Sequence, residues 1–238
     1  MATFSGLPLG CIFPEVPLSA RMPGVDNYVS LPVAPVIVKA PQIAYPMYGN
    51  DLIGDCTAAA AGHQIETWSY VAGLPLQQPS EAEVEAFYNA TKLPGQDGAV
   101  IETVLAYWKS NLLGGVEILG YAPITVSNVD QIKSAISLFG GCYVGIEMPA
   151  SGESQFSAQV PWNPTGSPED KAILGGHCVN LIGYNEYGFI FVTWGRLYLM
   201  SYAWWAEFGF EAYAIIPSSF QNSPLVDIAT LQSDLAQL

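Results

Sequence analysis

Residues 49–63 read GNDLIGDCTAAAAGH, and this stretch decides the fold. Two glycines, Gly49 and Gly54, indicate a tight loop, and the alanine-rich run that follows continues with the apolar spacing of a helix. Asp55 is a residue type that favours the N-cap position, so the sequence predicts a buried helix that begins at Cys56. Cys56 is thereby placed in the first turn of this helix.

A cysteine in the first turn of a helix lies in the partial positive charge of the helix N-terminus, which favours the thiolate over the thiol. Most free cysteines are nonetheless inert apolar residues of a core, so the surrounding residues must decide the role of Cys56. Asn50 stands six residues earlier. Its side-chain amide and the Cys56 backbone N–H are the donor pair that an oxyanion hole requires when a thiolate attacks a carbonyl.

The chain contains two histidines, so a general base for Cys56 is a choice between them. His63 lies seven residues after Cys56 on the same predicted helix, about 10 Å along its axis, which is too far for direct proton transfer. We therefore interpret His63 as a structural residue. His177 opens the predicted strand HCVNLIGY directly after Gly175 and Gly176, which leave room for a substrate beside its ring. His177 is the better base.

Helices are predicted mainly in the first part of the chain and strands in the second. After the helix at Cys56, helices are expected at residues 80–91, 99–110 and 129–139, of which the first has the capping-box residues Ser80 and Glu83. Strands are expected at residues 142–148, 177–184, 188–194 and 211–216. This order predicts an α+β fold, with a helical half packed against an antiparallel sheet.

Four stretches resemble segments of the papain-like (C1-type) cysteine peptidases, and they follow one another along the chain in the same order as in that family. Residues 49–63 resemble that family's nucleophile loop and central helix, and GGHCVNLIGYNEYGFIFVTWG, residues 175–195, resembles the stretch that begins with its catalytic histidine and ends in Trp-Gly. GQDGAVIETVLAYWKSNLLGG, residues 95–115, and IKSAISLFGGCYVGIEM, residues 132–148, resemble the segments between them. The resemblance spans roughly residues 45–216 and implies a divergent member with Cys56 as nucleophile, His177 as base and Asn50 in the oxyanion hole.

The resemblance also implies a substrate cleft at Gly54, Asp55, Gly176 and Trp194. The chain departs from the family around the nucleophile. Ile53 stands where the family has a second cysteine, and Thr57 stands where it has an aromatic residue. The disulfide that is usual at this place in the family is therefore not expected here.

The family orients its catalytic imidazole with an asparagine that has no clear counterpart in this chain. Counting back from Trp194 gives Val192 for this position, whereas counting forward from His177 gives Thr193. Of the two, only Thr193 can accept a hydrogen bond. Asn180, Asn185 or a backbone carbonyl remain alternatives.

Composition excludes some classes of partner. The 238 residues include 21 acidic and 7 basic ones, a net charge of −14, which repels nucleic acid. The N-terminal stretch lacks a basic region and its apolar residues are broken by Gly and Pro, so we expect no signal peptide, and no run is long enough to span a membrane. By default we expect a cytoplasmic protein.

The four cysteines are spaced too widely and irregularly for a zinc site or a dense disulfide scaffold. We therefore expect no metal or other cofactor, and we interpret Cys11, Cys142 and Cys178 as core residues. Three regions are expected: a Pro-rich N-terminal arm at residues 1–44, either structural or inhibitory, the papain-like domain at residues 45–217, and a helical tail at residues 218–238.

These residues predict a cysteine hydrolase, a peptidase or amidase that acts on a peptide or protein substrate through an acyl-enzyme intermediate. An acyl transferase or isopeptide-forming enzyme is an alternative, because an amine can replace water in the second step. A binding or structural protein that keeps the fold without turnover is the alternative from another class, since a fold does not fix a function.

Overall fold

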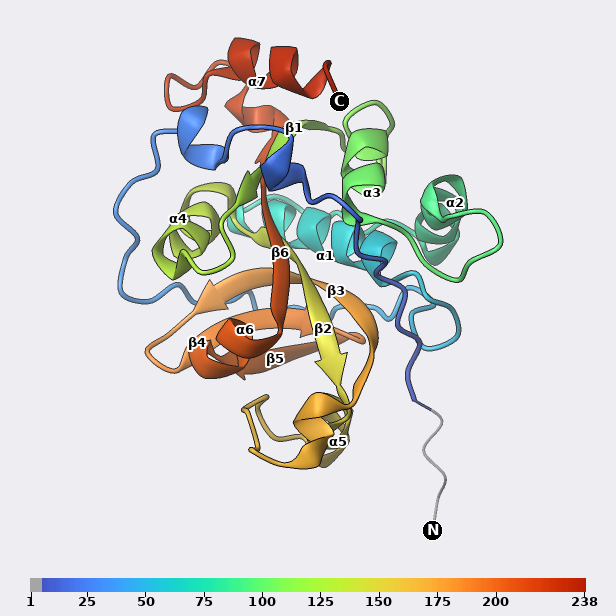
Figure 1. The fold of residues 1–238 in the computed structure, drawn as a ribbon. Helices are drawn as coiled ribbons and strands as arrows, with labels where there is room; N and C mark the ends of the chain where they lie inside the picture. Colours follow the sequence, from blue (N-terminus) through green and yellow to red (C-terminus); the bar gives the residue numbers. More distant parts are fainter. Residues whose placement is uncertain (1–5) are drawn as a thin grey trace.

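The computed structural model describes residues 6–238. The prediction of no signal peptide concerns the N-terminal stretch, and the first five residues of that stretch lie outside the described part. A six-stranded antiparallel sheet has the strand order β1-β6-β2-β3-β4-β5 (Figure 1). Its strands are β1 Ile118–Ile124, β2 Cys142–Pro149, β3 Ile173–Tyr184, β4 Gly188–Thr193, β5 Arg196–Ser201 and β6 Gly209–Pro217. The α-helices of the described residues are α1 Cys56–Val71, α2 Glu81–Thr91, α3 Ile101–Trp108, α4 Val129–Phe139, α5 Ala150–Ala158, α6 Tyr202–Phe208 and α7 Ile228–Leu235.

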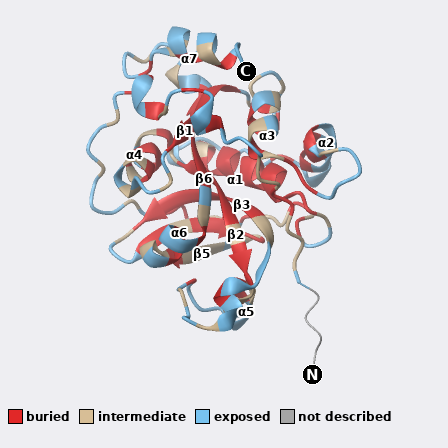
Figure 2. Cartoon of the chain, viewed as in Figure 1, coloured by how far each residue is buried: buried red, intermediate tan, exposed pale blue. Residues whose placement is uncertain are grey.

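The predicted α+β class is confirmed, and the structure shows why α1 is its central helix. Its alanine-rich first turns are almost fully buried, and the helix packs along β3 on one side and against α2 and α3 on the other (Figure 2). Gly62 is required at one close approach, because an added Cβ would lie 2.7 Å from the Tyr48 ring. Small side chains let the helix lie deep between the two halves of the molecule.

The helix ends follow local signals, with one difference. At α2, the Ser80 hydroxyl accepts from the Glu83 N–H and the Glu83 carboxylate accepts from the Ser80 N–H, which is the expected capping box. At α4, Gly140 ends the helix with φ +74°. Asp55 occupies the N-cap position of α1 but its carboxylate makes no capping hydrogen bond, so the cap predicted there is absent.

The separation of helices from strands is incomplete. Strand β1 lies between α3 and α4 in the chain and pairs with β6, the last strand. Every residue of β1 is buried, so its sequence ILGYAPI shows no alternation and carries a glycine and a proline in place of a strand signal. The aromatic segment YAWWAEF forms α6, with Trp204, Trp205 and Phe208 buried.

Both flanking regions share the main core with the papain-like part. In the arm, Leu18 and Val25 are buried in two short 3-10 helices, Leu18–Ala20 and Val25–Asn27, that contact β1, and Tyr28, which follows the second, is buried as well. The Tyr28 hydroxyl donates to Asp234 of α7 at 2.7 Å. Further along, the apolar run at residues 35–40 makes a single bridge, from Val38 to Tyr184, and no strand. The boundaries predicted at 44 and 217 stay predictions.

No helix within residues 6–238 has the length and apolar character needed to cross a bilayer.

Candidate active site

Cys56 lies where the two halves of the molecule meet. It is the first residue of α1 and is 1% exposed. Its Sγ accepts a hydrogen bond from the Cys178 backbone N–H at 3.4 Å, which joins the helix directly to β3. Since His177 precedes Cys178 in β3, this contact places the predicted nucleophile against the strand that carries the predicted base.

His177 is held on two sides. Its Nε2 lies 2.8 Å from the Thr193 hydroxyl at the end of β4, and its ring stacks on Trp194 with centroids 4.4 Å apart and planes inclined by 17°. Nδ1 is buried and has no hydrogen-bond partner in the described part of the chain. A proton on Nδ1 would be a buried donor without an acceptor, so the favoured neutral form carries its proton on Nε2 and donates it to Thr193.

This arrangement answers which residue contacts the imidazole. Val192 packs in a small apolar cluster with Tyr45 and Ile182. Asn185 accepts from the N–H groups of the β3–β4 turn, and the buried Asn180 side chain has no partner among the described residues. Of the candidates, Thr193 alone is placed on the ring.

The turn after β4 aims Trp194 at the histidine. Trp194 has φ +43° and Gly195 has φ +68°, so the chain reverses through two residues in the left-handed region. This conformation is unfavourable for a residue with a side chain, and such strain often marks a functional site. Trp194 is 2% exposed, so it forms the wall behind the His177 ring and not an open cleft surface.

The loop before Cys56 is tightly closed. The Asn50 amide nitrogen donates to the Ile53 carbonyl at 3.3 Å, so in this state it braces the loop. Asp55 is fully buried, and burial raises its pKa to about 7, although the nearby Asn50 amide acts against the rise. The oxyanion role of Asn50 stays a prediction, because its amide is engaged within the loop.

Burial keeps the candidate pair neutral. It raises the pKa of Cys56 to about 12, while the backbone amides of Cys178 and Gly10 act to lower it. Burial also lowers the pKa of His177 to about 3. At neutral pH Cys56 is therefore a thiol and His177 an unprotonated imidazole, and the two do not form a thiolate–imidazolium pair.

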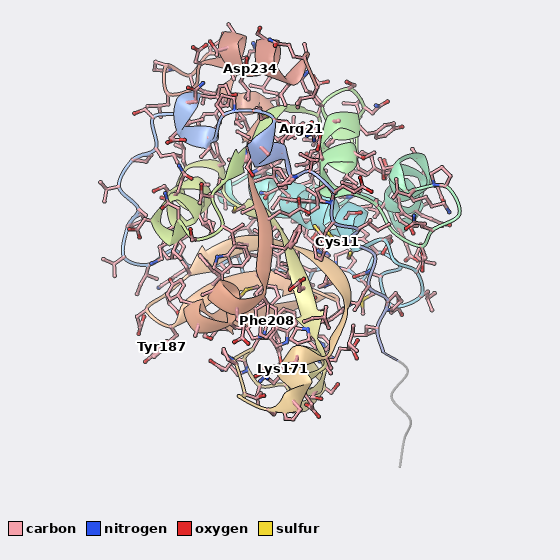
Figure 3. The ribbon with its side chains drawn as sticks, in the orientation of Figure 1. Cys11, Arg21, Lys171, Tyr187, Phe208 and Asp234 are labelled. Carbon is pink, nitrogen blue, oxygen red and sulfur yellow. The ribbon has the colours of Figure 1, made fainter. Side chains whose placement is uncertain are left out.

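The N-terminal arm covers this site with the residues Leu9–Phe13, which we call the covering segment. The Cys11 N–H donates to the Gly176 carbonyl at 3.0 Å, the Ala99 N–H donates to the Gly10 carbonyl at 2.8 Å, and the Ile12 N–H donates to the Ala99 carbonyl at 2.9 Å. The segment thus bridges the loop before α3 to β3, and Figure 3 shows Cys11 in the middle of the molecule, beside α1.

The glycines predicted to line the cleft are the surfaces that the covering segment touches. Gly10 lies on Gly54, where an added Cβ on Gly10 would be 2.6 Å from the Gly54 Cα. Gly176 faces Cys11 and the Phe13 ring, which stacks on Phe210 with centroids 3.9 Å apart. No pattern of side-chain types indicates this placement, because the segment is held mainly by its backbone.

His63 lies apart from this site. Its Nε2 is 2.8 Å from the Pro46 carbonyl oxygen, and its ring packs against Tyr45 and Tyr48. Burial lowers its pKa to about 4, which suits a neutral structural residue. The cysteines of residues 6–238 are all free and buried, and no three His, Cys, Asp or Glu side chains gather there as a metal site.

Known proteins match this chain in structure and not in sequence. No family model and no curated protein matches it. Xylellain, a cysteine protease from Xylella fastidiosa, is 16% identical, with a TM-score of 0.65 over 91% of this chain and 98% of that one. The cysteine protease and lectin-like domains of a surface layer associated protein of Clostridium difficile are 12% identical, with a TM-score of 0.58 over 89% and 56%.

A cysteine protease from Carica candamarcensis is 16% identical, with a TM-score of 0.53 over 76% of this chain and 98% of that one. The fold is therefore that of the papain-like cysteine proteases, as the order of motifs predicts. At these identities the likeness shows the fold alone.

Proposed function

We propose that the protein is a papain-like cysteine hydrolase, a peptidase or amidase, with Cys56 as nucleophile and His177 as general base. One observation carries the proposal: the Cys56 Sγ at the first turn of α1 accepts from the N–H of Cys178, and the preceding residue, His177, has its Nε2 on Thr193 and its Nδ1 without a described partner. A nucleophile, a general base and a group that orients the base are the three elements of a catalytic triad, and Cys56, His177 and Thr193 are proposed for these roles.

In the proposed reaction, His177 Nδ1 takes the thiol proton and the thiolate attacks the carbonyl carbon of an amide. The Cys56 N–H, which has no intrahelical acceptor, stabilises the oxyanion together with the Asn50 amide once that amide turns from Ile53. The imidazolium returns its proton to the amine that leaves. Water, with His177 again as base, then hydrolyses the thioester to a carboxylic acid and the free thiol.

We propose that the covering segment keeps this enzyme latent, so that the arm is inhibitory as well as structural. The Gly10 backbone amide acts to lower the Cys56 pKa, so the covering segment lies next to the sulfur. We propose that the segment occupies the site without being a substrate.

The proposal is tested by labelling the full-length Gly10→Ala protein, in which the added Cβ displaces the covering segment from Gly54, with a peptidyl epoxide and mapping the modified cysteine. We expect label at Cys56 that His177→Ala reduces at least tenfold. Cys142 is a buried free cysteine of β2, so Cys142→Ser is the matched control and keeps the rate. The proposal that the protein is an enzyme would be overturned if Cys56 were labelled equally fast with His177 and with His177→Ala, and no faster than Cys142.

A papain-fold binding or structural protein is the second candidate, because the pair is buried and neutral and the arm is continuous with the core. It predicts that Cys56 gains no epoxide reactivity even when the covering segment is displaced. An acyl transferase predicts the same labelling as a hydrolase, and it is recognised when an added amine, such as a lysine peptide, intercepts the acyl-enzyme.

A further inference from the structure

A cavity lies at the end of α1 that is farthest from the candidate active site. It has a volume of about 390 Å³ and is bounded by the last turns of α1, the end of α4, the segment that follows β6, and residues 38–41 of the arm. Figure 1 shows α4 at this end of α1. Cys56 begins α1, and Trp68 in the cavity wall lies about 18 Å further along the helix axis. The cavity is therefore separate from the site described above.

The wall of the cavity is mainly apolar. Side chains from all four segments form it, among them Val38, Ile65, Trp68, Leu138, Phe139 and Phe220. Val71 and Leu74 belong to the same cavity and are each 63% exposed, so its apolar surface continues out to solvent. Ligand sites measure roughly 300–1,000 Å³ and are lined mostly by apolar side chains, and exposed apolar surface that adjoins such a cavity is typical of a binding site.

The polar groups of the wall have little need of a cationic ligand. The Phe139 carbonyl accepts from the Trp68 indole N–H at 2.6 Å, and the Gly140 carbonyl accepts from the Gln64 amide at 3.4 Å. These carbonyls at the end of α4 are therefore already paired. Among residues 6–238, no Asp or Glu belongs to the wall. An ammonium group or a metal ion would find no charged partner here.

Lys39 is the charged residue of the wall. Its side chain is exposed, and it takes part in no ion pair within the described part of the chain. An exposed ammonium group at the edge of an apolar cavity is complementary to a molecule that combines an apolar chain with an anionic head. The carboxylate of a fatty acid is such a head, and its hydrocarbon chain matches the apolar wall.

We propose that this cavity binds a long-chain fatty acid, with the hydrocarbon chain against Trp68, Phe139 and Phe220 and the carboxylate paired with Lys39 at the opening. The site goes beyond the proposed function and does not depend on catalysis by Cys56. The net charge of −14 repels anions at long range, but salt at 0.15 M screens charges beyond about 8 Å. The neighbouring lysine therefore dominates the interaction with the carboxylate.

The test is calorimetric titration of the full chain with the sodium salts of the saturated fatty acids from octanoate to hexadecanoate. The titrations are made at pH 8 and 0.15 M NaCl, below the concentrations at which these salts form micelles. Since each buried CH₂ group adds a constant increment of binding free energy, we expect the Kd to fall about fourfold per CH₂ until the chain fills the cavity, and then to level off. No binding at any chain length would overturn the site.

Lys39→Met tests the charged contact, because methionine keeps an unbranched apolar side chain and removes the ammonium group. It should weaken the binding of decanoate at least fivefold and leave the binding of decanol, the neutral counterpart, unchanged. Lys171→Met, at an exposed lysine of the 3-10 helix Pro168–Lys171, is the matched control and should change neither. If Lys39→Met affected decanoate and decanol equally, the pairing with the carboxylate would be wrong.

Ala72→Trp tests the place of binding. Ala72 lines the cavity, is exposed, and has the backbone conformation of a right-handed helix, so a tryptophan fits there without disturbing the core and fills the opening. We expect it to weaken the binding of the fatty acid at least tenfold, whereas Ala203→Trp, at an exposed residue of α6, keeps the affinity. Unchanged affinity in Ala72→Trp would place the fatty acid elsewhere. Binding to phosphatidylcholine vesicles without binding of monomeric fatty acid would also refute the proposal, in favour of a membrane surface.

Discussion

Gly10→Ala should uncover Cys56 by a single methyl group. The added Cβ would lie 2.6 Å from the Gly54 Cα and nearer still to its carbonyl, against the ~3.5 Å of a normal carbon contact. Gly54 cannot move aside, because its N–H donates to the Asp97 carboxylate at 3.1 Å and its own Cα faces the Asp97 carbonyl. The overlap must therefore be relieved by displacement of the covering segment.

The size of the effect follows from what holds the segment. The covering segment makes three backbone hydrogen bonds to Gly176 and Ala99. It supplies the N–H donor in two of them and the carbonyl acceptor in the third. At a net contribution of about 1 kcal/mol each, the closed state is favoured by about 3 kcal/mol, or a factor of roughly 100. We expect Gly10→Ala to speed the modification of Cys56 by up to this factor.

The assay is iodoacetamide modification of the folded protein at neutral pH, with the label located by peptide mapping. Gly24→Ala is the matched control in the same arm, because its added Cβ would meet nothing nearer than the flexible Asp26 carboxylate, at 3.0 Å. Residues 18–29 remain anchored in the core, so thermal unfolding should change little. A Cys56 rate equal to that of the unsubstituted protein, with unchanged unfolding, would refute the closed-site reasoning.

Three further predictions concern the same groups. Thr193→Val, in the Gly10→Ala background, should lower epoxide labelling of Cys56 at least tenfold and stability by about 1–3 kcal/mol, since His177 Nε2 loses its only described partner, whereas Thr193→Ser keeps both. With a Cys56 pKa of about 12, modification of the unsubstituted protein should still rise between pH 7 and 10, whereas Gly10→Ala should level off. Burial raises the pKa of Glu211 to about 7, as it does for Asp55, so the folded state retains protons that the unfolded chain releases. The contribution of these two groups to stability is full below about pH 4 and is lost as the pH rises through 7. Calorimetry should therefore find a lower Tm at pH 8.5 than at pH 5.5.

The start of α1 was predictable because a loop glycine followed by an alanine-rich run marks the helix. The strand at residues 177–184 was predicted from its apolar run, but β3 begins earlier, at Ile173, so His177 lies inside the strand and does not open it. Thr193 was one of several candidates, since residue counting along two strands cannot tell which neighbour meets the ring. The register shift between Leu181 and Gly183 is the kind of irregularity that makes such counting ambiguous.

The covered state of the site was beyond the sequence for a different reason. The covering segment is held through main-chain groups of Gly10, Cys11 and Ile12, and main-chain hydrogen bonds leave no pattern of side-chain types. Strand β1 was missed because full burial removes the alternation that identifies a strand. Long-range placement in both cases depends on partners more than twenty residues away, which a local pattern does not encode.

The covering segment acts on the candidate pair by chemistry as well as by obstruction. Desolvation is the largest cause of the raised Cys56 pKa and the cause of the lowered His177 pKa. With a thiol pKa near 12, a fraction on the order of 10⁻⁵ is thiolate at pH 7, so a small reagent that reached the sulfur would still find little nucleophile. Displacing the segment admits water, which stabilises both charged forms and moves the two pKa values toward each other. One movement of five residues thus exposes Cys56 and ionises it, and for this reason Gly10→Ala should change the pH profile of labelling and not only its rate.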